Sequence, residues 1–204
     1  MGLYADQVLP RIVNRVLDNE ETRGWRRRCV EGMRGVVVEP GFGSGLNIEV
    51  YPDEVTKVYA VDPAELGQKL AADRIRSTDV EIEFIGLDGA VLPLDNQTCD
   101  SALLTFTLCT IPDANQALAE VRRVLVPGGR LHFLEHGHAP DLRVQTWQRR
   151  IEPAQKVVGD GCHLTRNMTE LIEGAGFEVE WVDEAYARGP KPWSFFYVGQ
   201  AISP

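Results

Sequence analysis

The chain has 204 residues, with 21 lysines and arginines against 30 aspartates and glutamates, a formal net charge of −9 and 44% hydrophobic residues. This composition is typical of a globular protein, and the length suits a single domain over residues 1–204. The acidic balance argues against binding to the phosphate backbone of nucleic acids. No apolar run approaches the length of a membrane-spanning helix, and an acidic residue near the start argues against a signal peptide, so we expect a cytoplasmic protein without stable membrane insertion.

Two amphipathic segments precede residue 35 and predict a helical cap over residues 1–34. The first carries an apolar stripe, which we expect to contact the core or to cover the acceptor site rather than to anchor the chain in a membrane: Val8, Leu9, Ile12, Val13 and Val16. The second is rich in arginine, and we expect a solvated helix face made of Arg23, Arg26, Arg27, Arg28 and Arg34.

Along the middle of the chain, a short apolar run, a turn rich in Gly, Pro or Asp, and a helical stretch repeat several times. This alternation predicts βαβ units and a parallel sheet with strands at 35–39, 57–61, 81–85, 101–106 and 130–135 and helices at 65–75 and 113–125. Beyond residue 135 we expect a helical insertion at 142–158, a helix at 168–175 and two strands at 178–182 and 195–201.

Three alternate glycines follow the first predicted strand: Gly41, Gly43 and Gly45. Glycine there permits positive φ and lets a ligand approach the backbone closely. The dinucleotide-binding pattern requires a third glycine where this chain has Leu46, which weakens the interpretation as a nicotinamide-dependent oxidoreductase. Asp62, at the end of the second predicted strand, suits the hydroxyls of a ribose in either kind of nucleoside site.

Four features together resemble the motifs of class I S-adenosylmethionine-dependent methyltransferases. They are the glycine segment that begins at Glu39, then Asp62, then Asp88, and finally the sequence Pro-Gly-Gly at 127–129. The resemblance implies an α/β Rossmann-like fold whose seven-stranded, mostly parallel sheet has an antiparallel last strand and helices on both faces. It also implies S-adenosylmethionine as the cofactor and S-adenosylhomocysteine as its product. The cofactor-binding residues that it implies are Glu39, Gly41, Phe42, Gly43, Gly45, Asp62, Pro63, Leu87, Asp88, Gly89, Thr105 and Leu108.

A second resemblance begins at Cys109 and continues through His136 to the segments 160–166 and 174–177. These segments look like the thiol methyltransferase-like branch of the class I enzymes and its small bacterial relatives. The resemblance implies a small-molecule acceptor, a thiol or a similar soft nucleophile. It also implies that the helical insertion at 140–166 lies near the acceptor.

A thiol reacts as the thiolate, so a neighbouring carboxylate or imidazole is a candidate for removing its proton. The candidates are Asp160, His136 and His163. Each has a structural alternative, because an Asp before a glycine is typical of a turn and a histidine often hydrogen-bonds locally. Cys162 is a less favoured candidate for a methyl carrier, and small buried cysteines are common.

We expect no metal ion. The cysteines form no C-x-x-C pair, so we expect reduced thiols. The cluster of His132, Glu135, His136 and His138 is spread along one predicted strand, which separates His132 from His136 by about 13 Å. Three functions compete with thiol methylation: O- or C-methylation of a phenol or quinone, a nicotinamide-dependent oxidoreductase, and a module that binds S-adenosylmethionine without catalysis.

Overall fold

The structure is a computed structural model that describes residues 8–63, 65–86 and 89–204. Its centre is a seven-stranded sheet in the order β3-β2-β1-β4-β5-β7-β6. The strands are β1 (Gly35–Pro40), β2 (Val55–Val61), β3 (Glu81–Gly86), β4 (Cys99–Thr105), β5 (Leu125–His136), β6 (Glu178–Tyr186) and β7 (Phe195–Ile202). The pairs from β3 to β5 are parallel, and β7 is antiparallel to both β5 and β6. The predicted fold class, including its antiparallel last strand, is confirmed.

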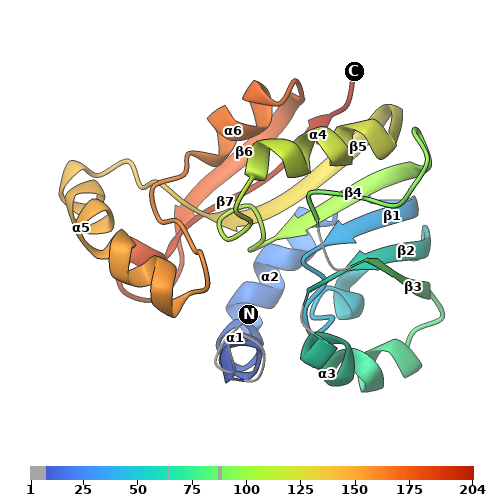
Figure 1. Cartoon of the computed structure of the whole chain (residues 1–204), viewed down its shortest axis with the longest axis horizontal. Helices are drawn as coiled ribbons and strands as arrows, with labels where there is room; N and C mark the ends of the chain where they lie inside the picture. The colour runs from blue at the N-terminus through green and yellow to red at the C-terminus, as the bar shows by residue number, and fades with distance from the viewer. Residues whose placement is uncertain (1–7, 64, 87–88) are drawn as a thin grey trace.

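Helices cover both faces of the sheet (Figure 1). They are α1 (Leu9–Leu17), α2 (Glu20–Cys29), α3 (Glu65–Arg76), α4 (Ala114–Val124), α5 (Leu142–Val158) and α6 (Met168–Gly174), with short 3₁₀ turns η2 (Ile48–Val50) and η3 (Lys191–Trp193). Figure 1 shows α4 and α6 on one side, α2 and α3 on the other, and α5 beyond one end of the sheet.

The alternation of side chains along the strands divides the core into two layers. Val38 and Leu104 face the layer that packs on α4 and α6, whereas their neighbours Val37 and Leu103 face the layer beneath α2 and α3. All four side chains are fully buried. Strands that are covered on both faces explain the continuous apolar runs in the sequence.

Local hydrogen bonds set where α4 and β5 begin. Asp113 caps α4 by accepting a hydrogen bond from the Gln116 backbone N–H at 2.9 Å. β5 begins earlier than predicted, because the Pro-Gly-Gly segment is part of the strand and the Gly128 N–H donates to the carbonyl of Ser203.

The structure corrects two expectations about the first 34 residues. Of the two alternatives for the apolar stripe of α1, contact with the core does not occur within the described residues: Val8, Ile12, Val13 and Val16 are exposed, and α1 has no buried residue. Arg26 is not solvated but only 4% exposed, because α2 packs on β5 and β7 and turns this one arginine inward. The remaining arginines of α2 form surface ion pairs, such as Arg23 with Glu20 and Arg28 with Glu31.

Candidate active site

The glycine loop, residues 41–45, leaves the carboxyl end of β1 with its backbone in the left-handed region at every second residue. The φ angles are +78° at Gly41, +58° at Gly43 and +71° at Gly45. A Cβ atom on Gly41 would lie 1.9 Å from the Thr107 hydroxyl oxygen, so no larger residue fits there. The loop therefore presents bare backbone at the end of the sheet where parallel α/β folds bind their ligands.

Asp62 lies at the carboxyl end of the neighbouring strand β2 and is buried. Its carboxylate accepts a hydrogen bond of 2.8 Å from the Gly43 backbone N–H, which fixes the loop relative to β2. Pro63 follows it and is exposed, while Gly89 packs close to Pro40 and Ile111 at the same end of the sheet. The predicted cofactor residues Leu87 and Asp88 lie outside the described residues.

Glu39, in β1, is fully buried inside a polar network. Its carboxylate accepts hydrogen bonds from the Asn47 amide at 2.8 Å and from the Tyr51 hydroxyl. Arg26 donates to Asn47 Oδ1 at 2.5 Å and to Thr105 Oγ1 at 3.2 Å. Burial raises the pKa of Glu39 to about 7, while these donors and the charge of Arg26 oppose the shift. A carboxyl group held in this way is sensitive to any further positive charge bound beside it.

Phe42 and Leu108, two further predicted cofactor residues, lie in the core. Phe42 is 3% exposed and packs edge to face on Phe84, with ring centroids 5.3 Å apart. Leu108 has no exposed surface. Through these side chains the glycine loop and the segment after β4 are anchored to opposite core layers.

Glu135, near the end of β5, organises the segment that follows β4. Its buried carboxylate accepts three backbone N–H bonds, from Thr107 at 2.7 Å, Leu108 at 2.9 Å and Cys109 at 3.2 Å. Burial raises the pKa of Glu135, and the three N–H donors oppose that shift. Thr107 also donates its hydroxyl to the carbonyl of Pro40 at 3.1 Å, so this segment bridges β5 and the start of the glycine loop.

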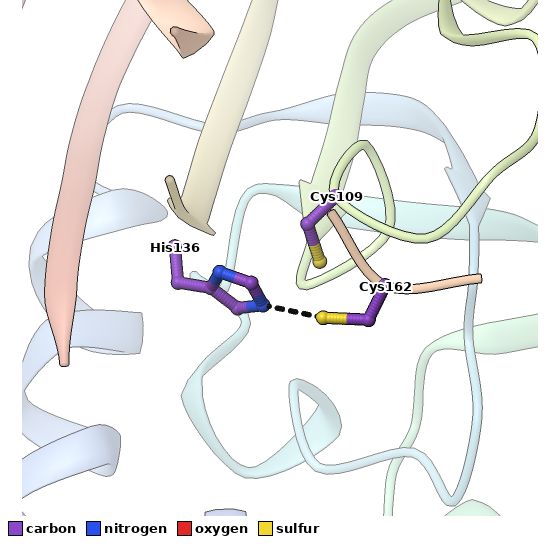
Figure 2. A group of neighbouring side chains, drawn as sticks. All are labelled: Cys109, His136 and Cys162. Atoms are coloured by element: carbon purple, nitrogen blue, oxygen red, sulfur yellow. Dashed lines mark hydrogen bonds between the residues drawn. The ribbon is translucent and has the colours of Figure 1, made fainter. Parts of the chain in front are cut away.

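Cys109, His136 and Cys162 meet beside this segment, each from a different part of the chain (Figure 2). Their two Sγ atoms and a ring nitrogen of His136 all lie within 4.8 Å of one another, and His136 Nε2 is 3.0 Å from Cys162 Sγ. Contact with Cys109 and burial raise the pKa of the Cys162 thiol. The pKa of His136 is raised as well, because its contact with Cys162 and the charge of Glu135 outweigh the effect of burial.

Asp160 and His163 flank this group in the turn after α5. Asp160 is exposed with φ of +47°, as the turn alternative predicts. The backbone N–H of His163 donates to the carbonyl of Cys109 at 2.7 Å, and its Nδ1 lies 3.5 Å from Glu152 Oε1. Burial lowers the pKa of His163. The structure thus brings His136 to the sulfurs, while His163 contributes its backbone and Asp160 shapes the turn.

The histidines of β5 and Glu135 point to different partners in the part of the chain that the structure describes. His132 is fully buried, and its Nδ1 lies 2.8 Å from the carbonyl of Cys29 beneath α2. Burial lowers the pKa of His132 to about 4. Glu135 points instead to the backbone of residues 107–109.

Several residues of the site carry no signal in the sequence. Asn47 and Tyr51 reach Glu39 only because η2 folds back toward β1, and Arg26 arrives from α2. The proximity of Cys109 to Cys162 depends on the backbone hydrogen bond between residues 163 and 109.

Among the residues with described structure, no helix combines the length and the apolar character that crossing a membrane requires.

Residues 38–133 match a family model described as a methyltransferase domain. Thiol S-methyltransferase TMT1B of Rattus norvegicus is 34% identical to the chain over 173 residues, which are 81% of this chain and 68% of the relative. Demethylmenaquinone methyltransferase of Renibacterium salmoninarum is 34% identical over 139 residues, which are 65% of this chain and 57% of the relative.

A solved structure of a SAM-dependent methyltransferase from Thermotoga maritima has a TM-score of 0.66 at 20% sequence identity. The match covers 98% of this chain and 99% of that one. It therefore includes the terminal strands β6 and β7 as well as β1 to β5.

Proposed function

Because the chain belongs to the class I S-adenosylmethionine-dependent methyltransferases, we propose that it transfers the methyl group of this cofactor to the sulfur of a small thiol. A thiol acceptor is supported by the position of His136 beside residues 107–109. These residues join the glycine loop to the end of β5. At the same identity of 34%, the thiol S-methyltransferase relative is aligned over 81% of this chain and a demethylmenaquinone methyltransferase over 65%. A demethylmenaquinone methyltransferase that is aligned over 94% of the chain is less similar, at 27% identity.

The donor site that we propose is formed by the glycine loop, Glu39 and Asp62. S-adenosylmethionine supplies a methyl group on a positively charged sulfonium sulfur. Glu39 and Asp62 place two buried carboxyl groups at the ends of adjacent strands, which suits a cationic ligand with ribose hydroxyls. Gly89 is proposed to lie against the adenine, because it packs near Pro40 at the same edge.

The protein's main task in such a reaction is to align the acceptor and to exclude water. The buried segment at Leu108 and Cys109 excludes water on one side of His136, and His136 favours the thiolate form of the acceptor. The exposed carboxylate of Asp160 is the second candidate for this role. We propose that α1 covers the donor, because the Ser44 hydroxyl of the glycine loop donates a hydrogen bond to Asn14 Oδ1 at 2.6 Å.

The Asp62→Ala variant is expected to bind S-adenosylhomocysteine roughly 10- to 150-fold more weakly, which corresponds to about 1.5–3 kcal/mol for hydrogen bonds to a charged acceptor. Asp62→Asn keeps an oxygen for the Gly43 N–H and isolates the loss of charge. Isothermal titration calorimetry measures both, with the exposed Asp53→Ala as the control. Equal affinities for Asp62→Ala and the parent would remove Asp62 from the donor site.

A panel of acceptors tests the proposed function itself. We expect methylation of small aliphatic thiols to be at least about tenfold faster than that of amines of the same shape, and to accelerate as the pH rises toward the thiol pKa. A reduced, demethylated menaquinone in detergent belongs in the panel, because quinone methylation is the second candidate. The methylated products are identified and quantified by mass spectrometry. Faster methylation of the quinol carbon than of every thiol would contradict the proposal.

A further inference from the structure

The group formed by Cys109, His136 and Cys162 has the composition of a metal site. Two sulfurs and an imidazole nitrogen come from the segment after β4, the end of β5 and the turn after α5, and all three atoms lie within 4.8 Å of one another (Figure 2). Around a tetrahedral zinc ion such atoms are separated by about 3.5–3.8 Å, given Zn–S and Zn–N bonds of about 2.3 and 2.0–2.1 Å. The 4.8 Å limit exceeds these separations by about 1 Å, a difference that rotation of a side chain removes.

The backbone beneath these side chains is held in place from several directions. Glu135 fixes the N–H of Cys109, and the N–H of His163 fixes its carbonyl at 2.7 Å. Arg166 donates to the carbonyls of Leu108 and Ile111 on either side of the cysteine. Packing two small thiols does not require a scaffold of this kind, whereas a binding site benefits from ligands that are already positioned.

The donor set favours zinc over harder cations, because thiolate and imidazole are soft or borderline ligands. Three protein ligands leave one position of a tetrahedral ion open, which is the pattern of catalytic rather than structural zinc. Within the described residues, no fourth His, Cys, Asp or Glu joins the group. The open position therefore remains for water or for a molecule bound from outside.

We propose that Cys109, His136 and Cys162 bind one Zn²⁺ ion and that the sulfur of the acceptor thiol occupies its fourth position. The role of the fourth position rests on the proposed function, because it requires that the acceptor is a thiol. Zinc deprotonates a coordinating thiol at neutral pH, so in this arrangement His136 assists proton removal as a ligand of the ion.

Charge is balanced in this arrangement. Two cysteine thiolates neutralise the ion, and a bound acceptor thiolate adds one negative charge. The Arg166 guanidinium is close enough to interact electrostatically with both Cys109 and Cys162, and it offsets that charge. Arg166 is itself held by backbone carbonyls, including that of Pro112 at 3.2 Å.

The reaction at this site conserves atoms and electrons. The acceptor thiol loses its proton to solvent as its sulfur joins the ion, and a lone pair of that sulfur then attacks the methyl carbon of S-adenosylmethionine. A sulfur–carbon bond forms as the carbon–sulfonium bond breaks, and the electron pair of the broken bond returns to the donor sulfur, which gives S-adenosylhomocysteine. The methylated product is a neutral thioether, a weaker zinc ligand than a thiolate, and it leaves the fourth position.

The test uses the full chain, reduced with a phosphine, stripped with a chelator and then incubated with zinc sulfate. Zinc content after dialysis is measured by mass spectrometry, and affinity is measured by competition with a chromophoric chelator. We expect one zinc per chain and a loss of affinity of at least tenfold in Cys109→Ala and in Cys162→Ala. Cys99→Ala is the matched control, because Cys99 is also fully buried but lies outside the group.

Cobalt and activity provide two independent readouts. Cobalt(II) chloride added to the stripped chain should give a sulfur-to-cobalt absorption band that changes when an aliphatic thiol is added. S-adenosylhomocysteine binding by the variants shows that they remain folded. Zinc affinity that is the same in Cys162→Ala and the parent, or full thiol methylation by the stripped chain, would overturn the zinc site and leave the proposed function standing. The protein could instead bind zinc, show no change in its cobalt spectrum when a thiol is added, and methylate only other acceptors. That result would overturn the proposed function and with it the role of the fourth position.

Discussion

Replacing His136 with glutamine is expected to slow methyl transfer to the best thiol by about 10²–10⁴-fold, the usual contribution of a group that assists proton removal. His136 is the imidazole next to the sulfurs of the site, with Nε2 3.0 Å from Cys162 Sγ. The side-chain hydrogen bond of His136 goes to Cys162 and not to the glycine loop, Glu39 or Asp62, so the affinity for S-adenosylhomocysteine is expected to stay close to that of the parent. The rate with saturating thiol and the calorimetric affinity measure the two effects separately.

A matched control distinguishes this role from a general effect of removing an imidazole. His138 lies two residues further along and engages the Tyr197 hydroxyl through its backbone carbonyl, so His138→Gln should keep most of the activity. Raising the pH should partly restore His136→Gln, because the acceptor then ionises without assistance. Asp160→Asn is expected to lose less than His136→Gln. A greater loss in Asp160→Asn would transfer the role to the carboxylate and contradict the one proposed for His136.

Much of the fold could be predicted from the sequence because its signals are local. Continuous apolar runs such as that of β4 require burial on both faces, and the alternation with helices requires parallel connections. The signal of the glycine loop is equally local, since the positive φ at Gly41, Gly43 and Gly45 favours glycine. The resemblance to class I methyltransferases rests on these short segments and is confirmed.

Arg26 shows where local patterns fail. Five arginines between residues 23 and 34 predict a solvated surface, yet one of them lies beneath the sheet and bonds to Asn47 and Thr105. Only the packing of α2 on β5 and β7 decides which arginine turns inward. A buried charge that is linked to Glu39 through Asn47 is not visible in any spacing along the chain.

The sulfur and imidazole group was missed for a related reason. Metal motifs are recognised in sequences when the ligands stand a few residues apart, whereas Cys162 lies 26 residues from His136. The expectation that no metal binds rested on the absence of a C-x-x-C pair and on the separation of His132 from His136 along one strand. The two sulfurs and the imidazole converge because the turn after α5 pairs its backbone with the segment after β4, a contact that depends on the tertiary fold.

Glu135 is the residue on which this convergence depends most. It is fully buried, and one of its carboxylate oxygens accepts from Thr107 and Leu108 while the other accepts from Cys109. In Glu135→Gln, one oxygen becomes an NH₂ group that cannot accept a hydrogen bond. At least one buried N–H is then left unpaired, and the charge that strengthened the remaining bonds is lost.

We therefore expect Glu135→Gln to lower the free energy of unfolding by about 2–4 kcal/mol, measured by urea denaturation. Glu180→Gln is the control, because Glu180 pairs with Arg130 at the surface and such pairs contribute less than about 1 kcal/mol. Loss of the hydrogen bond that fixes the Cys109 N–H should also weaken zinc binding in Glu135→Gln. The contact between Gly43 of the glycine loop and Asp62 is kept. Unfolding of Glu135→Gln at the same urea concentration as the parent would show that residues 107–109 hold their shape without the carboxylate, and that their position is set by packing alone.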